Sequence, residues 1–249
     1  MKYSLADIKR SYTPEKAWAE MQGELPCYLI YRPLSFYPSW LLLRLHVPIM
    51  AVTLSSGVLA LVMVFLAWQG GPWAWLAVVA SGFCFHVLDC VDGNMARTTG
   101  RFSRLGALLD GTIDMSFWCL LFLSTGFLVE HQGGGIFGDR AVSFSLFLAI
   151  LVLLNRQTRD NFSVQNAESS YFRESIPEHL SLGDRAMMVF VGLENVYILA
   201  IAIGVGLGGL DWVLLGMGVY VGLIFVGALG LTFSQARRLD RPTSSSDPH

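Results

Sequence analysis

Four aspartates interrupt two long apolar stretches of this sequence. Asp89 and Asp92 are three residues apart near the end of one stretch, and Asp110 and Asp114 are four apart near the start of the next. Residues at these spacings share one face of a helix, so each pair can point in a single direction. Because charged groups inside apolar helices are rare and costly, the four carboxylates predict a functional site.

Convergence of the four carboxylates would require cations beside them. Two neighbouring antiparallel helices would bring both pairs together, and carboxylates that meet in a low dielectric repel unless positive charge compensates them. Carboxylate oxygens suit Mg²⁺, Mn²⁺ or Ca²⁺, and two such ions about 3.5 to 4 Å apart form a clamp for phosphoryl chemistry. The pattern therefore predicts a divalent-cation site that handles phosphate groups.

Small residues lie among the aspartates. Gly93, Ala96, Gly106 and Gly111 leave room for the phosphates of a ligand, or for a helix backbone, to come close. Arg97 follows at the end of the apolar stretch that carries Asp89 and Asp92, where a water-soluble nucleotide could enter. We therefore expect a phosphate-bearing ligand beside the carboxylates.

The composition is that of a membrane protein. Of 249 residues, 53% are hydrophobic and 14% are charged, and the mean hydropathy is +0.52. An ordinary soluble domain carries about 25% charged residues, so a soluble domain and a disordered chain are both excluded. The net charge of −2 gives no basic field for a nucleic-acid partner. The four cysteines have no metal-ligand spacing, which predicts reduced packing residues.

The apolar stretches predict an all-α polytopic fold with six transmembrane helices. A spanning helix needs roughly 20 apolar residues. The stretches that meet this need lie at 46–68, 72–96, 105–129, 141–155 (continued to 159), 186–207 and 210–233. This divides the chain into a cytoplasmic or interfacial segment (1–45), a catalytic membrane domain (46–235) and a disordered tail (236–249).

The distribution of positive charge predicts the orientation. With both termini on one side of the membrane, 16 of the 17 Lys and Arg residues lie on that side, and Arg140 alone lies on the other. Positive residues in short loops favour the cytoplasm. We therefore predict a multi-pass protein of the cytoplasmic (inner) membrane, with both termini and the active site facing the cytoplasm. Residues 33–45 mix aromatic side chains with leucine, which predicts a helix lying in the membrane interface.

The aspartates belong to a longer motif. Residues 89–114 read D-x2-D-G-x2-A-R-x8-G-x3-D-x3-D without a departure. This resembles the signature of the CDP-alcohol phosphotransferase (CDP-alcohol phosphatidyltransferase) family. The resemblance implies six transmembrane helices with cytoplasmic termini, a homodimer, and transfer of a substituted phosphate from a CDP-linked donor to an alcohol with release of CMP.

The resemblance also implies a role for each signature residue. Asp89, Asp92 and Asp110 would hold two divalent cations, Mg²⁺ or Mn²⁺, and Asp114 would be the general base and a further metal contact. The CDP donor would meet Asp89, Gly93, Ala96, Arg97 and Gly106. Upstream, Val52 and Thr53 resemble part of the family's Asn-x-Val-Thr motif, but Met50 stands where that motif has Asn.

Charged residues outside the signature are candidates for binding the acceptor. The candidates are Arg156, Arg159, Arg185 and Glu194. Guanidinium groups bind phosphate well, so the arginines would suit inositol phosphate or glycerol phosphate; the same arginines could instead be topology anchors. A carboxylate such as Glu194 is costly inside a span, so it could bind acceptor hydroxyls or pair with an arginine. Serine, inositol and choline stay open as acceptors.

The sequence thus favours an enzyme that moves a phosphatidyl group from CDP-diacylglycerol to a polar alcohol in phospholipid biosynthesis. An alternative within the family is transfer of a phosphoalcohol from a CDP-alcohol to a lipid alcohol. A cation-coupled transporter is an alternative from another class, although a transport path would place charges near the bilayer midplane on several helices. A catalytically silent scaffold is disfavoured because every signature position is intact.

Overall fold

The computed structural model describes residues 3–166, 189–190 and 192–239, and the elements in these ranges are helices. Four short ones come first: α1 (Leu5–Ser11), α2 (Pro14–Gly23), the π-helical turn η1 (Cys27–Tyr31) and α3 (Arg32–Arg44). The long helices and their connecting turns follow: α4 (Ile49–Gln69), α5 (Ala74–Thr99), α6 (Arg104–His131), η2 (Gly135–Arg140), α7 (Ala141–Gln165), η4 (Gly192–Val196), α9 (Tyr197–Leu207) and α10 (Leu210–Leu239). The all-α polytopic fold is confirmed.

Five segments are long and apolar enough to cross a membrane. They are α4, α5, α6, η2 with α7, and α10. The described part of the predicted fifth span is a shorter apolar segment, Gly192–Leu207, in which the 3-10 turn η4 precedes the 11-residue helix α9. The count of six spans stays a prediction, since residues 167–188 lie outside the description.

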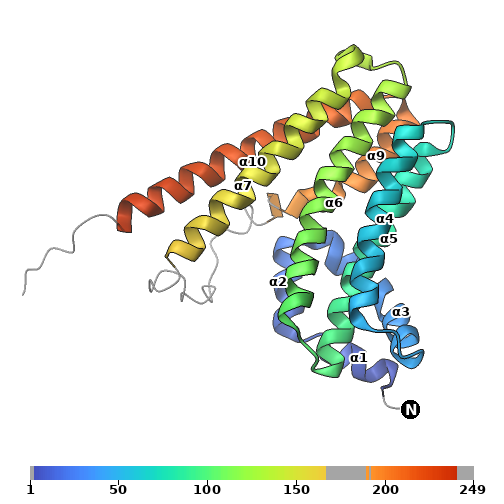
Figure 1. Cartoon of the computed structure of the whole chain (residues 1–249), viewed down its shortest axis with the longest axis vertical. Coiled ribbons are helices and arrows are strands. Elements are labelled where there is room, and N and C mark those ends of the chain that lie inside the picture. The colour runs from blue at the N-terminus through green and yellow to red at the C-terminus, as the bar shows by residue number, and fades with distance from the viewer. Residues whose placement is uncertain (1–2, 167–188, 191, 240–249) are drawn as a thin grey trace, which may run out of the picture.

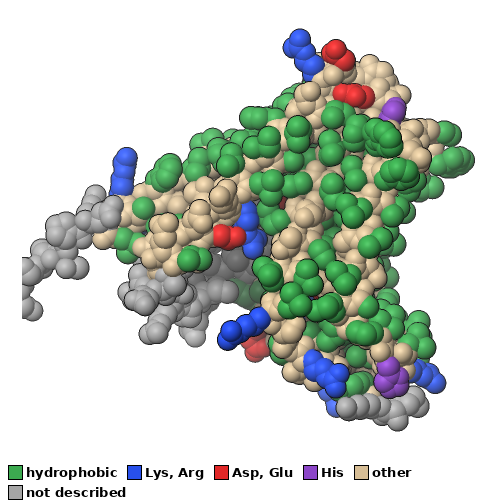
Figure 2. Space-filling view, in the orientation of Figure 1, with side chains coloured by type: hydrophobic (Ala, Val, Ile, Leu, Met, Phe, Trp, Pro, Cys, Tyr) green, Lys and Arg blue, Asp and Glu red, His purple; other side chains and the backbone are tan. Residues whose placement is uncertain are grey.

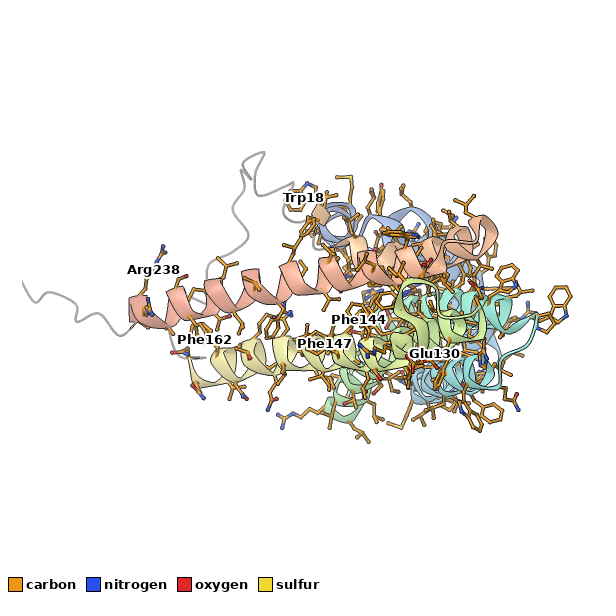
Figure 3. The ribbon with its side chains drawn as sticks, turned by 90° about the horizontal axis from the view of Figure 1, so that it is seen from above. Trp18, Glu130, Phe144, Phe147, Phe162 and Arg238 are labelled. Atoms are coloured by element: carbon orange, nitrogen blue, oxygen red, sulfur yellow. The ribbon has the colours of Figure 1, made fainter. Side chains whose placement is uncertain are left out.

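The long helices form a bundle from which two members project. Helix α4 packs along both α5 and α6, and α6 packs along α7. Helices α7 and α10 lie side by side and extend away from the bundle, as both views of the ribbon show (Figures 1 and 3). Apolar side chains cover the visible outer face of the long helices (Figure 2), as a lipid-facing surface requires.

The first helices gather at one end of the bundle. Helices α1 and α3 both pack against α5, at the lower end of the molecule in Figure 1. Helix α1 begins with a capping box, in which the Ser4 and Asp7 side chains each accept from the other residue's backbone N–H. Residues 32–44 are helical, close to the predicted 33–45. The interfacial position of this helix stays a prediction.

A short turn between α5 and α6 returns the chain beside the aspartates. Helix α5 ends at Thr99 and is capped by Gly100, whose φ of +66° is a left-handed conformation that glycine adopts without strain. Ser103 caps the start of α6 at Arg104, and its Oγ accepts a hydrogen bond from the Gly106 N–H at 2.9 Å. Because the turn is short, the end of α5 and the start of α6 lie next to each other.

The C-terminal helix is longer than expected. Helix α10 runs through Leu239, so the predicted domain boundary at 235 falls inside a helix, and Arg237 and Arg238 occupy its last turn. Residues 240–249, the rest of the predicted tail, lie outside the description. The predicted fourth span is also longer as a helix, since α7 continues to Gln165.

Candidate active site

Three of the four signature aspartates form one cluster. Carboxylate oxygens of Asp89, Asp92 and Asp110 all lie within 4.8 Å of one another. Asp89 and Asp92 come from the last turns of α5, and Asp110 comes from the second turn of α6. The donor set is carboxylate oxygen, which is what Mg²⁺ and Mn²⁺ prefer, so these residues fit the expected divalent cations.

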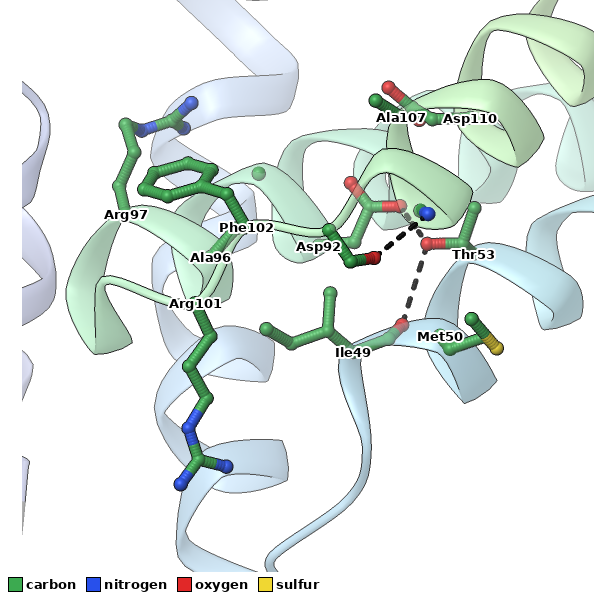
Figure 4. Close-up of a pocket in the computed structure, with 13 residues that line it drawn as sticks. Ile49, Met50, Thr53, Asp92, Ala96, Arg97, Arg101, Phe102, Ala107 and Asp110 are labelled. Atoms are coloured by element: carbon green, nitrogen blue, oxygen red, sulfur yellow. Dashed lines mark hydrogen bonds between the residues drawn. The ribbon is translucent and has the colours of Figure 1, made fainter.

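Helix α4 orients one member of this cluster. The Thr53 Oγ1 donates a hydrogen bond of 2.6 Å to Oδ2 of Asp92, and it also lies 3.4 Å from the carbonyl oxygen of Ile49 (Figure 4). Asp92 is 7% exposed and Thr53 4%. Hydrogen-bonded partners of metal-binding carboxylates fix their orientation. Sequence reasoning noted Thr53 as part of a motif but gave it no role.

A first cavity of about 370 Å³ opens on one side of the cluster. Asp92 and Asp110 line it together with four residues that the resemblance assigns to the CDP donor: Gly93, Ala96, Arg97 and Gly106. Met50, Arg101 and Phe102 complete much of its wall (Figure 4). Asp89, the remaining residue predicted to meet the donor, is not among the residues that line this cavity.

At two glycines in the wall of this cavity, a polar side chain lies close to the helix backbone. A Cβ on Gly93 would lie 3.2 Å from Nη1 of Arg97, so the guanidinium group rests almost directly on the helix backbone. A Cβ on Gly106 would lie 2.8 Å from the capping Oγ of Ser103. Larger residues at either position would displace a neighbouring polar group, and at Gly106 that group is the cap of α6.

A second cavity of about 420 Å³ also borders the cluster. Asp89, Asp110 and Asp114 line it, so Asp110 belongs to both cavities. The other charged residues in its wall are Glu24, Arg156 and Glu194, which come from three distant parts of the chain. Asp114 lies one helical turn beyond Asp110 and is not part of the three-carboxylate cluster.

Two of the candidate acceptor residues line the second cavity. Arg156 and Glu194 line the second cavity, and the Nε of Arg156 also pairs with Oδ2 of Asp160 at 2.8 Å. Arg159 is exposed on the same helix as Arg156. Arg185 lies outside the described residues.

Part of this second wall is aromatic. The sequence favoured His86 as an interior histidine rather than a ligand, and it did not indicate Tyr31 or Trp118. Tyr31, His86 and Trp118 line the cavity, and the rings of Tyr31 and His86 stack with centroids 4.7 Å apart. The His86 side chain is buried, and within the described part of the chain its Nε2 has no hydrogen-bond partner. His86 lies three residues before Asp89 and Trp118 four after Asp114, so helical spacing places each on the face of an aspartate. Tyr31 comes from the η1 turn, and only its contact with α5 brings it to this wall.

Fold and site together define a polytopic helical membrane protein with a carboxylate cluster that borders two cavities. A family model described as CDP-alcohol phosphatidyltransferase matches residues 45–224. The chain therefore belongs to the CDP-alcohol phosphatidyltransferase family, and the resemblance inferred from the signature is confirmed.

Curated relatives match over a shorter region. The chain is 42% identical over 81 residues to a phosphatidylinositol phosphate synthase of Streptomyces avermitilis, covering 32% of this chain and 31% of that protein. It is 39% identical over 97 residues to a phosphatidylinositol phosphate synthase of Cutibacterium acnes, covering 38% and 44%. It is 35% identical over 81 residues to human ethanolaminephosphotransferase 1, covering 32% and 18%. The chain thus spans less than half the length of each of these relatives.

Proposed function

We propose that this chain transfers a phosphatidyl group from CDP-diacylglycerol to a polar alcohol and releases CMP, as a step of phospholipid biosynthesis in the cytoplasmic membrane. One observation carries the proposal: aspartates of the cluster line two cavities, and Asp110 lines both. A transfer between two substrates needs a site for each of them beside one reaction centre.

The first cavity is assigned to the CDP donor. Gly93, Ala96 and Gly106 leave its floor without large side chains, and Arg97 supplies positive charge for the diphosphate. Asp89, Asp92 and Asp110 would hold two divalent cations, Mg²⁺ or Mn²⁺. When bound, these ions neutralise the diphosphate and stabilise the CMP leaving group.

The second cavity is assigned to the acceptor alcohol. The hydroxyl oxygen of the acceptor would attack the phosphorus that carries the diacylglycerol group, and Asp114 would accept the proton of that hydroxyl. A new phosphorus–oxygen bond forms, the bond from that phosphorus to the oxygen shared with the CMP phosphate breaks, and CMP leaves with the electron pair. Asp114 lines this cavity beside the cluster, as a base of this kind requires.

A phosphorylated alcohol is the acceptor that we favour. Arg156 reaches the second cavity and a guanidinium group binds phosphate well. Two of the bacterial relatives are named phosphatidylinositol phosphate synthase. We therefore propose inositol phosphate or glycerol phosphate, with Arg156, Arg159 and Arg185 contributing positive charge and Glu194 binding hydroxyls.

The second candidate is transfer of a phosphoalcohol from a CDP-alcohol to a lipid alcohol. The similarity to human ethanolaminephosphotransferase 1 over the signature region favours it. Membership of the family argues against the cation-coupled transporter that the intramembrane aspartates also suggested. The homodimer implied by the resemblance stays a proposal.

Release of CMP is the experiment that tests this function. The purified chain in nanodiscs is given CDP-diacylglycerol and Mg²⁺ or Mn²⁺ with inositol phosphate, glycerol phosphate, serine, inositol or choline in turn. Metal-dependent release with one acceptor supports the proposal and identifies the product. Release only from CDP-ethanolamine or CDP-choline with diacylglycerol would support the second candidate, and no release with any pair would contradict both.

A further inference from the structure

The signature helix α5 carries a buried asparagine that the signature does not specify. Asn94 lies between Gly93 and Ala96, and its side chain is fully buried. Its surroundings come from α3, a helix that precedes the region matched by the family model, which starts at residue 45. The first 44 residues therefore contact the signature directly.

Asn94 binds two guanidinium groups through one oxygen. Its Oδ1 accepts hydrogen bonds from Nη1 of Arg32 at 3.0 Å and from Nη2 of Arg97 at 2.9 Å. Its Nδ2 donates to Oγ of Ser35 at 2.8 Å and to Oγ of Ser39 at 3.3 Å. Because both ends of the amide have partners, its oxygen can only face the two arginines.

An acidic residue from α2 neutralises the first of these arginines. Glu20, 1% exposed, contacts Arg32 at two points, Nε to Oε2 at 3.2 Å and Nη2 to Oε1, and also accepts from the Tyr12 hydroxyl at 2.9 Å. Burial acts to raise the pKa of Glu20, but the hydrogen bonds and charge of Arg32 outweigh it, and the pKa lies below the ordinary value. Without Glu20, two cations would repel each other across one amide.

The second arginine, Arg97, has a nitrogen without a hydrogen-bond partner in the described part of the chain. Arg97 lines the first cavity, and within the described residues its buried Nε has no hydrogen-bond partner. Its guanidinium group rests on Gly93, one residue from Asp92 of the cluster. Asn94 therefore fixes one edge of the guanidinium group of a residue that lines the first cavity, and the Nε–H of that group has no partner among the described residues.

We propose that Asn94 is a positioning residue for donor binding: it holds Arg97 toward the diphosphate, and the Glu20–Arg32 pair of the preceding helices holds Asn94. The identity of the ligand rests on the proposed function, but the hydrogen-bonded chain from Glu20 to Arg97 does not. The segment before the family-matched region thus completes the donor site, because it carries the pair that orients a signature arginine.

Binding of CDP to the full-length chain tests this proposal without requiring turnover. Titration with CDP and Mg²⁺ compares the wild type with Asn94→Ala, Asn94→Asp and Asn166→Ala. Asn166 is a matched control, because it lies at the distant end of α7, where its Nδ2 donates to the Phe162 carbonyl. Asn94→Asp keeps an oxygen that accepts from both arginines.

We expect Asn94→Ala to weaken CDP binding about tenfold, equivalent to about 1.4 kcal/mol. Asn94→Asp should stay within about threefold of the wild type, and Asn166→Ala within twofold. In turnover assays the KM for the donor should rise in Asn94→Ala while the KM for the acceptor is unchanged. A merely structural role would lower the amount of folded protein and leave the CDP affinity of the folded fraction unchanged.

Three outcomes would overturn the proposal. They are equal CDP affinity in Asn94→Ala and the wild type, equal impairment in Asn94→Ala and Asn94→Asp, and no CDP binding by the wild type. If Asn94→Ala does not fold, Arg32→Lys decides, because lysine keeps the charge but cannot contact Glu20 and Asn94 together; unchanged affinity in that variant would contradict the proposal. CDP binding without CMP release would contradict the proposed function alone.

Discussion

The two cavities beside the carboxylate cluster are built in different ways. Most residues that line the first cavity lie between 92 and 110, in the end of α5, the start of α6 and the turn between them, with three more from the start of α4. The second cavity takes its wall from residues between 24 and 195. A contiguous wall leaves a short motif in the sequence, and a dispersed wall leaves none. This difference explains why the signature indicates the donor chemistry, whereas the acceptor can only be proposed.

The base that we place in the second cavity gives the largest expected effect. Asp114→Asn keeps the shape of the side chain but removes its ability to take a proton, so kcat should fall about 10²- to 10⁴-fold. The Mg²⁺ concentration for half-maximal activity should be unchanged, because the three-carboxylate cluster is intact. Rates of CMP release across a Mg²⁺ titration measure both quantities.

Asp211→Asn is the matched control for that variant. Asp211 lies at the opposite end of the bundle, where Oδ2 accepts from the Ile136 N–H at 3.1 Å, and its variant should keep kcat within twofold. If Asp114→Asn keeps the wild-type kcat, Asp114 is not the base and the assignment of the second cavity loses its main support.

Loss of the hydrogen bond that orients Asp92 in the cluster should have the next largest effect. Thr53→Val removes the hydroxyl that donates to Asp92 and preserves the side-chain volume. We expect the metal affinity to fall about 10- to 100-fold, as is typical when a partner of a metal-binding residue is lost. The kcat at saturating Mg²⁺ should change less.

Thr112→Val provides the comparison for Thr53→Val. Thr112 is exposed on α6 and donates only to the Leu108 carbonyl of its own helix, so its variant should keep the wild-type metal dependence. Equal Mg²⁺ dependence in both variants would show that Thr53 does not orient the cluster.

The candidate acceptor residues offer a sharper test of the second cavity. Arg156→Ala should raise the KM for a phosphorylated acceptor about tenfold, because a charge-assisted hydrogen bond contributes roughly 1.5 to 3 kcal/mol. The KM for the donor should not move. Arg159→Ala should have a smaller effect, because Arg159 is exposed whereas Arg156 lines the cavity. An effect of Arg159→Ala that exceeds that of Arg156→Ala would contradict this placement.

The smallest expected effect is on how the stability of the fold depends on pH, and it arises from the buried Glu20–Arg32 pair. The pKa of Glu20 lies below its ordinary 4.5, since the hydrogen bonds and charge of Arg32 outweigh burial. A lowered pKa stabilises the folded state above the unfolded value, and that contribution is lost as the pH falls from about 4.5 through the folded value. Unfolding midpoints in detergent between pH 7 and pH 4 should fall more for the wild type than for Glu20→Gln. Parallel curves would contradict the role of the pair.

Much of the fold was predictable because the lipid phase restricts what a chain can do. Backbone polar groups in a bilayer must bond within their own segment, so long apolar runs become helices. The predicted spans at 46–68, 72–96 and 105–129 correspond to α4, α5 and α6 within three residues at each end. The apolar runs predicted membrane spans rather than helix ends, and α7 and α10 continue beyond them to Gln165 and Leu239.

The site was predictable only where its geometry is local. Spacings of three and four residues place the aspartates on helix faces, and the cluster of Asp89, Asp92 and Asp110 follows from one short turn between two helices. The contacts of Thr53 with Asp92 and of Asn94 with Arg32 join residues 39 and 62 positions apart. No periodicity relates residues at such separations.

By itself, the sequence determined the membrane class, the family and the carboxylates that the structure brings into one cluster, because hydropathy and helical spacing act over a few turns of one chain. Only the tertiary structure decided which residues line the second cavity, that Arg156 rather than Arg159 lies in its wall, and that helices before the family-matched region hold Arg97. These depend on how helices pack against one another, and packing is decided by the shapes and buried polar partners of side chains far apart in the sequence.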